Sequence, residues 1–177
     1  FNMGNALQEQ GKLDEAIEAY TKALAINPGY VEVYCNMGNA LNGITFEQPN
    51  PSLQKTIFSL LDKKSYARPK NIAPASISLL KFEPELLQHL KSPPFAEAEP
   101  KILEVIADLS KLPLLPKLMS VCPLADIALE HLFRSIRASL LLSISDLTGS
   151  PEVLNFQSAL ALQCFTNEYI YCLLYTS

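Results

Sequence analysis

The sequence predicts an all-α fold, in which a short stack of paired helices is followed by an irregular helical bundle. The six residues Asn2-Met-Gly-Asn-Ala-Leu7 recur letter for letter from Asn36 to Leu41, an offset of 34 residues. Identity over six positions does not arise by chance, and this period is typical of helix-pair repeats. Elsewhere apolar residues recur at helical spacing. Alternating strand patterns and Asn-Gly hairpin turns are almost absent, so strands are not expected.

The first 42 residues read as helix, turn and helix, followed by one more helix. Gly11 breaks the chain, Leu13-Asp-Glu-Ala16 opens the second helix, and Pro28 ends it. The third helix is expected over residues 31–42. Gly4 and its counterpart Gly38 would each weaken a helix by about 1 kcal/mol relative to alanine. A close contact with a neighbouring helix is therefore expected at these glycines.

A series of small, aromatic and turn residues in this region resembles the tetratricopeptide repeat, which has 34 residues per helix pair. The series comprises Gly4, Leu7, Gly11, Ala16, Tyr20, Ala23 and Pro28. The resemblance implies that residues 1–42 hold about one and a half repeats, truncated at the amino end. The pattern stops at Gly43, where residues 44–50 replace the expected opening of a second helix. Residues 43–49 are therefore the expected linker.

Residues 50–171 are expected to form the irregular helical domain, with prolines separating its helices. Asn50-Pro51 is typical of a helix start, and Ala73-Pro74 is interpreted as a break. Asp126, Glu130, Arg134 and Arg137 are expected on the solvent side of one long helix. The predicted helices cover residues 51–63, 74–80, 84–90, 102–109, 114–119, 124–144 and 151–165.

The two ends of the sequence indicate a piece of a longer protein. The chain begins at Phe1 inside a helical pattern. Its last six residues, 172–177, resemble a translated sequencing-adapter tail, so they are expected to be non-native and are excluded from fold reasoning.

Composition argues against several classes of function. The net charge is −4 and the Lys and Arg residues are scattered, so nucleic acid is not an expected partner. No apolar run approaches the roughly 20 residues that span a bilayer. The four cysteines form no CxxC pair, which favours reduced thiols, no metal site and a cytoplasmic location. His89 and His131 are expected to be solvated.

Motifs for catalysis or cofactor binding are also missing. No phosphate-cradling glycine loop, GxSxG elbow or HExxH pattern occurs. The sequence therefore predicts no catalytic residue, no cofactor and no enzyme activity within this chain. The leading hypothesis is a scaffold that binds a protein or an extended peptide.

Four asparagines are the candidate partner-binding residues. Asn2 and Asn5 lie three apart on the first helix of one repeat, and Asn36 and Asn39 lie three apart on the first helix of the next. Each amide offers a donor and an acceptor, which suits the backbone of an extended peptide. These helices resemble those of the O-linked N-acetylglucosamine transferase family, and that resemblance implies an asparagine ladder along the concave helix face.

Two other roles are left open by the sequence. The run from Leu112 to Met119 and on through Cys164-Phe-Thr-Asn-Glu-Tyr169 resembles the helical segment that joins tetratricopeptide repeats to a methyltransferase domain in some bacterial fusion proteins. That resemblance implies a downstream catalytic domain whose S-adenosylmethionine site lies outside this chain. Alternatively, residues 50–171 cap the repeats or mediate dimerisation.

Overall fold

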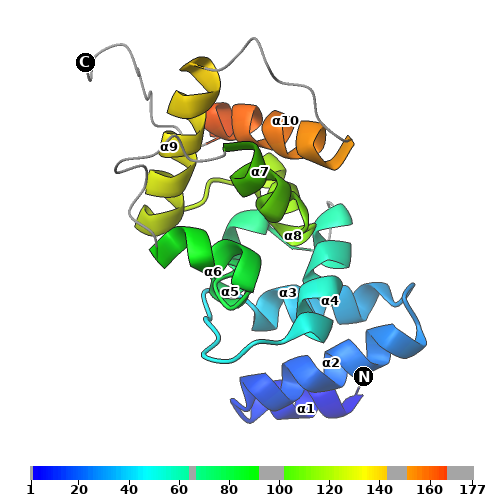
Figure 1. Ribbon diagram of the computed structural model, residues 1–177. Coiled ribbons are helices and arrows are strands. Elements are labelled where there is room, and N and C mark those ends of the chain that lie inside the picture. Colours follow the sequence, from blue (N-terminus) through cyan, green and yellow to red (C-terminus); the bar gives the residue numbers. More distant parts are fainter. Residues whose placement is uncertain (1, 64–66, 92–101, 143–150, 167–177) are drawn as a thin grey trace. The chain divides into compact units, whose positions relative to one another are not determined.

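The computed structural model describes residues 2–63, 67–91, 102–142 and 151–166. All regular secondary structure in these four ranges is helical, so the predicted all-α class is confirmed (Figure 1). The chain divides into two compact units, Phe1–Leu79 and Leu80–Ser177. Each unit is described by itself.

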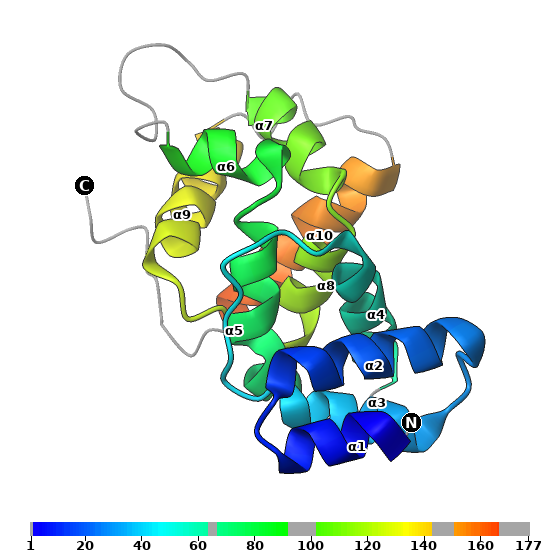
Figure 2. The ribbon, with the colours of Figure 1, turned by 90° about the horizontal axis from the view of Figure 1, so that it is seen from below.

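The first unit opens with three helices, α1 (Asn2–Glu9), α2 (Leu13–Ile26) and α3 (Val31–Ala40). Helix α2 packs against both α1 and α3, and Figure 2 shows the three running side by side. Gly11 joins α1 to α2 with a φ of 75°, a left-handed conformation that glycine adopts without strain. The helix, turn and helix order predicted for residues 1–42 is therefore confirmed.

Gly4 lets α1 approach α2 closely. A Cβ atom built on Gly4 would lie 2.5 Å from Cε1 and 2.8 Å from Cδ1 of Tyr20. Tyr20 itself is fully buried on α2. The close contact expected at Gly4 is thus present, and its partner is the aromatic ring in the middle of the second helix.

Helix α4 (Pro51–Asp62) also belongs to the first unit and packs against α2. Its start is as predicted, because the Asn50 side chain accepts a hydrogen bond from the Leu53 amide at 3.0 Å and Pro51 occupies the first turn. Its buried stripe, also as predicted, consists of Leu53, Ile57, Leu60 and Leu61.

The segment before α4 is tied to α5 (Pro69–Leu80). The Gly43 amide donates to the Asn71 carbonyl at 3.0 Å, and the Phe46 amide donates to Ser78 Oγ at 2.9 Å. Residues 43–49, the expected linker, lie within the first compact unit.

The predicted break at Ala73-Pro74 is wrong, because Pro74 lies inside α5. An internal proline removes one hydrogen bond and costs about 3 kcal/mol. Burial of apolar side chains along the same helix offsets this cost. The fully buried ones include Ile72, Ala75 and Leu79, on both sides of the proline. Packing therefore overrides the local signal that Pro74 gives.

The second unit contains α6 (Pro84–Lys91), α7 (Ile102–Ser110), α8 (Leu114–Val121), α9 (Ile127–Leu142) and α10 (Pro151–Thr166). Helix α10 packs against α7 and α8, and α6 packs against α7 and α9. The buried rings of Phe133 and Phe156 meet edge to face, with their centroids 6.5 Å apart. These two rings join α9 to α10.

Two charged residues of α9 depart from the expected solvent face. The side chains of Glu130 and Arg137 are 16% and 11% exposed and form an ion pair of 3.1 Å. Arg137 also donates to Gln163 Oε1 at 3.3 Å. The prediction was wrong here because α10 supplies a polar partner that a pattern within α9 does not reveal.

Some expectations concern residues outside the described ranges. They include the proposed non-native tail at 172–177, the end of the predicted domain at 167–171 and Ile144. Within the ranges that are described, no helix is both long and apolar enough to cross a bilayer.

The first prediction concerns the contact between α1 and α2. Gly4→Ala should destabilise the chain by about 1–3 kcal/mol, because the added methyl group meets a packed ring. This loss should exceed the gain in helix propensity of about 1 kcal/mol. Guanidinium unfolding of both proteins measures the difference. Gly29→Ala is the control, since its added Cβ would have one neighbour, Asn27 Oδ1 at 3.4 Å. Equal stability of Gly4→Ala and the wild type would contradict the prediction.

Candidate functional site

The candidate site begins with a hydrogen bond between two of the four predicted asparagines. Asn36 Nδ2 on α3 donates to Asn5 Oδ1 on α1 at 2.8 Å. Both side chains are half-buried. The amides of successive first helices are therefore directly joined.

Asn2 and Asn39 occupy the outer positions and are exposed. Among the described residues, no side-chain hydrogen bond connects either of them to the Asn5–Asn36 pair. The repeat explains this difference, because Asn2 is equivalent to Asn36 and Asn5 to Asn39. The observed bond thus joins the first asparagine of one repeat to the second asparagine of the repeat before it.

Tyr20 lies beneath the pair and extends the network. Its hydroxyl donates to Asn5 Oδ1 at 2.8 Å and approaches Gln8 Oε1 at 2.9 Å. A phenol has a single proton, so the two amide oxygens share it. Burial, and next the negative charge of Glu9, raise the pKa of the Tyr20 phenol above its ordinary value of 10.0. The hydroxyl therefore remains protonated throughout the physiological range.

A hollow of about 450 Å³, open to solvent, lies over this network and is lined by Asn5, Gln8, Glu9 and Asn36. Three of these residues are amides and one is a carboxylate. Such a lining can donate and accept hydrogen bonds with a neutral polar chain. It contains neither a nucleophile nor a general base paired with one.

Sequence reasoning identified Asn5 and Asn36 but missed three residues of this network. Gln8 lies three residues after Asn5 and so shares its helix face, a signal that was available. Glu9 forms the rim of the hollow. Tyr20 was interpreted as a packing residue only, and nothing in its spacing shows where its hydroxyl ends.

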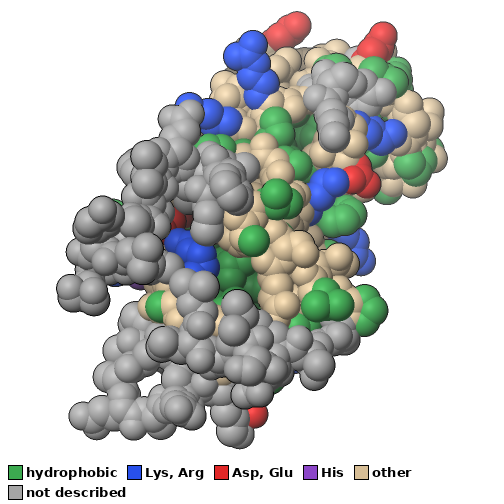
Figure 3. Space-filling view, turned by 90° about the horizontal axis from the view of Figure 1, so that it is seen from above, with side chains coloured by type: hydrophobic (Ala, Val, Ile, Leu, Met, Phe, Trp, Pro, Cys, Tyr) green, Lys and Arg blue, Asp and Glu red, His purple; other side chains and the backbone are tan. Residues whose placement is uncertain are grey.

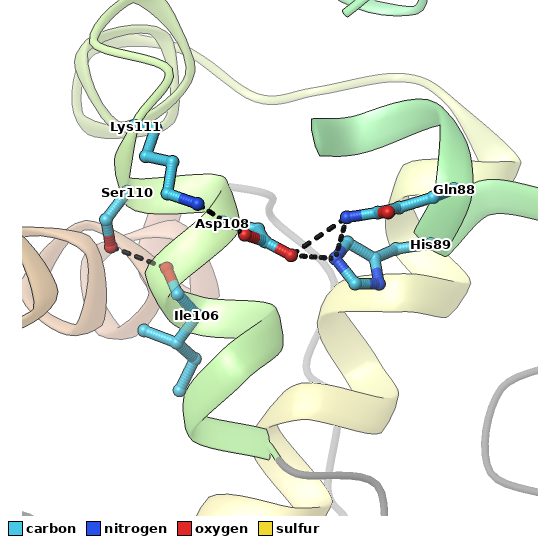
Figure 4. Close-up of polar contacts among 6 residues, drawn as sticks. All are labelled: Gln88, His89, Ile106, Asp108, Ser110 and Lys111. Atoms are coloured by element: carbon cyan, nitrogen blue, oxygen red, sulfur yellow. Dashed lines mark hydrogen bonds and ion pairs between the residues drawn. The ribbon is translucent and has the colours of Figure 1, made fainter. Parts of the chain in front are cut away.

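A second polar cluster lies in the second unit and joins α6 to α7 (Figure 4). Asp108 Oδ2 accepts from Gln88 Nε2 at 2.8 Å and lies 3.1 Å from His89 Nε2, while Lys111 Nζ lies 2.7 Å from Oδ1. The His89 side chain is 18% exposed. The expectation that His89 is solvated was therefore wrong, because α7 places an acid opposite it.

This cluster has the acid and base of a catalytic dyad but no nucleophile. The nearby hydroxyl of Ser110 donates to the carbonyl of Ile106, in its own helix, at 2.6 Å (Figure 4). The hydrogen bond from Lys111 is the main cause that lowers the pKa of Asp108 from 3.8. Because Gln88 on α6 donates to this carboxylate on α7, the ionised Asp108 cross-links the two helices.

Cysteine and metal chemistry find little support in the described ranges. Burial raises the pKa of the Cys122 thiol to about 11, so it is a poor nucleophile at neutral pH. No group of three or more His, Cys, Asp or Glu side chains in these ranges could hold a metal ion. On the face shown in Figure 3, the described Lys and Arg side chains are spread out and form no continuous stripe.

The second prediction concerns the Asp108 cluster. Because the folded-state pKa is lowered, its stabilisation is present above pH 3.8 and is lost as the pH falls through the folded-state value. Asp108→Asn should therefore cost on the order of 1 kcal/mol at neutral pH and nearly nothing in strong acid. Urea unfolding at several pH values measures this difference. Glu32→Gln, which neutralises an exposed acid on α3, should show no comparable pH dependence. A cost for Asp108→Asn that does not vary with pH would contradict the assignment.

Comparison with known proteins bears on the first unit. Residues 4–42 match the family model described as TPR repeat, a stretch that holds most of α1 and all of α2 and α3. Searches of curated proteins and of solved structures gave no significant match. Repeats of this family generally mediate protein–protein interaction, and stacked helical repeats present extended binding surfaces. The matched stretch contains both Asn5 and Asn36, so the amide network lies within the residues that are similar to this repeat.

Proposed function

We propose that the chain is a protein-interaction module whose first unit binds an extended peptide segment of a partner protein. The site is the amide hollow, the depression lined by Asn5, Gln8, Glu9 and Asn36. The observation that carries the proposal is the hydrogen bond from Asn36 to Asn5, which sets amides of two successive repeats side by side.

The lining of the amide hollow favours a peptide backbone as ligand. An extended backbone presents amide N–H and C=O groups at regular intervals, and side-chain amides can pair with both. Such hydrogen bonds recognise the peptide backbone, so peptides with many different side chains can bind. The single carboxylate, Glu9, adds a preference for a neutral or basic segment over an acidic one.

Asn2 and Asn39 flank the hollow in this proposal. Their exposed amides would contact the same peptide on either side of the central pair. Exposed contacts at an interface rim contribute less than central ones. Asn5 and Asn36 should therefore dominate the affinity, with Asn2 and Asn39 giving smaller contributions.

The other roles suggested by the sequence have less support. An accessory role beside a methyltransferase domain rests on the resemblance of residues 112–169 alone. A capping or dimerisation role for residues 50–171 rests on their position after the repeats. No contact among the described residues favours either role over peptide binding, and the proposed module uses no cofactor.

The third prediction tests the amide hollow directly. The chain is screened against an array of random 12-residue peptides, and the best binder is measured by fluorescence anisotropy. Asn36→Ala should raise the Kd about tenfold, the loss expected for one central hydrogen bond. Asn39→Ala should have a smaller effect, and the double variant should combine both. Asn42→Ala, which removes an exposed amide beyond α3, is the matched control.

A modified peptide tests whether the backbone is read. N-methylation of alternate residues removes N–H donors without changing side chains, and it should abolish binding in one register. Alanine substitution at the same positions should be tolerated. Circular dichroism checks that each variant keeps its helical signal. Unchanged affinity of the folded double variant would remove the asparagines from the mechanism.

A further inference from the structure

We propose that the outer face of α1, defined here by Met3, Ala6 and Leu7, is a second docking surface, which binds an amphipathic helix of a partner protein. None of these three residues lines the amide hollow. The inference therefore goes beyond the proposed binding of an extended peptide and does not depend on it.

The observation behind this inference is that the same six residues occur on two helices of the first unit in different surroundings. Residues 2–7, on α1, are identical to residues 36–41, which form the end of α3 and its cap. Met37 is 0% exposed, whereas its counterpart Met3 is 67% exposed. Because both the sequence and the helical conformation are the same, the two methionines differ in what covers them.

The neighbouring positions show the same contrast. Ala40 and Leu41 are buried, whereas the equivalent Ala6 is exposed and Leu7 is half-buried. Met3, Ala6 and Leu7 are spaced three and one residues apart, so they lie on one side of α1. A single exposed apolar residue would be ordinary on a protein surface. Here a set of side chains that is buried on α3 is open to solvent on α1.

The copy on α3 indicates what kind of element covers such a face. Helix α2 packs against α3, and it also packs against α1, where the Tyr20 ring meets Gly4. Figures 1 and 2 show α1 at the edge of this group of three helices. The face is therefore buried where it occurs within a stack of helices and exposed where it occurs at the edge of one. A helix is the element that fits it.

Helix α2 also indicates the chemistry of the partner. Its buried residues combine one small and three large apolar side chains at helical spacing, namely Ala16, Ile17, Tyr20 and Leu24. Side chains of one packed helix enter the grooves of the other, and the small Ala6 leaves room for a large one. The partner helix should carry a similar apolar stripe. Burial of Met3 under this stripe would favour binding, and this mode of recognition differs from the reading of an extended backbone.

The test uses a synthetic copy of α2 as the probe. A fluorescent peptide of residues 12–27 contains the whole helix. Glu18 and Lys22 form an exposed ion pair of 2.6 Å one turn apart, so a lactam between their side chains can hold the peptide helical without altering its buried residues. The peptide is titrated with the full chain and followed by fluorescence anisotropy. Saturable binding to the wild-type chain is expected.

Two variants of the outer face are compared with a matched control. Met3→Glu and Ala6→Glu should each raise the Kd about tenfold or more, because a carboxylate would be buried against an apolar helix. Both residues are exposed, so circular dichroism should show an unchanged helical signal. Ile26→Glu is the control, since it places the same charge at another exposed apolar residue of the first unit. It should bind the peptide as the wild type does.

The outcomes separate this surface from the amide hollow and from self-association. Loss of binding in both α1 variants, with binding retained in Ile26→Glu, supports the proposal. Failure of the helical peptide to bind the wild-type chain, or equal binding by Met3→Glu, overturns it and leaves the proposed function in place. Light scattering tests the other occupant. If the wild type is a dimer that Met3→Glu dissociates, a second copy covers the face and the partner helix is wrong.

Discussion

The contact between Gly4 and the Tyr20 ring is the constraint on which the first unit depends. It sets how closely α1 approaches α2, because any side chain on Gly4 would collide with a fully buried ring. The same ring carries its hydroxyl to the level of Asn5 and Gln8. Helix packing and the arrangement of the polar surface therefore have one common cause, and a change at Gly4 would disturb both.

The two units use buried polar groups differently. In the first, the Tyr20 hydroxyl contacts amides that border an open hollow, so part of the network is open to solvent. In the second, the carboxylate of Asp108 accepts a hydrogen bond from Gln88 on α6 and forms an ion pair with Lys111. The carboxylate of Glu130 forms an ion pair with Arg137 on the same helix. Polar groups whose hydrogen bonds are all made within the protein stabilise its fold. Polar groups that still have a donor or acceptor available can bind a partner. This contrast supports a site in the first unit.

Much of the fold could be predicted from the sequence, because the repeated residues and the apolar spacings are patterns among residues close together along the chain. The start of α4 at Asn50-Pro51 and its buried stripe follow from local rules alone. Pro74 could not be predicted in the same way, since its place inside α5 depends on tertiary burial. Of the candidate site, the Asn5–Asn36 face followed from the repeat. The Tyr20 hydroxyl did not, because its partners lie 12 and 15 residues away on another helix.

The bond from Asn36 to Asn5 spans two repeats, and so it belongs to a junction and to neither repeat alone. In a regular array, an equivalent bond would form wherever one repeat follows another, and the number of such bonds would be one fewer than the number of repeats. Among the described residues, Asn2 and Asn39 are the two outer asparagines of this row, and both are exposed. Each further junction between two repeats would lengthen the stretch of peptide that such a surface can contact. Its affinity would then depend on how many repeats are stacked and only weakly on the sequence within any one of them.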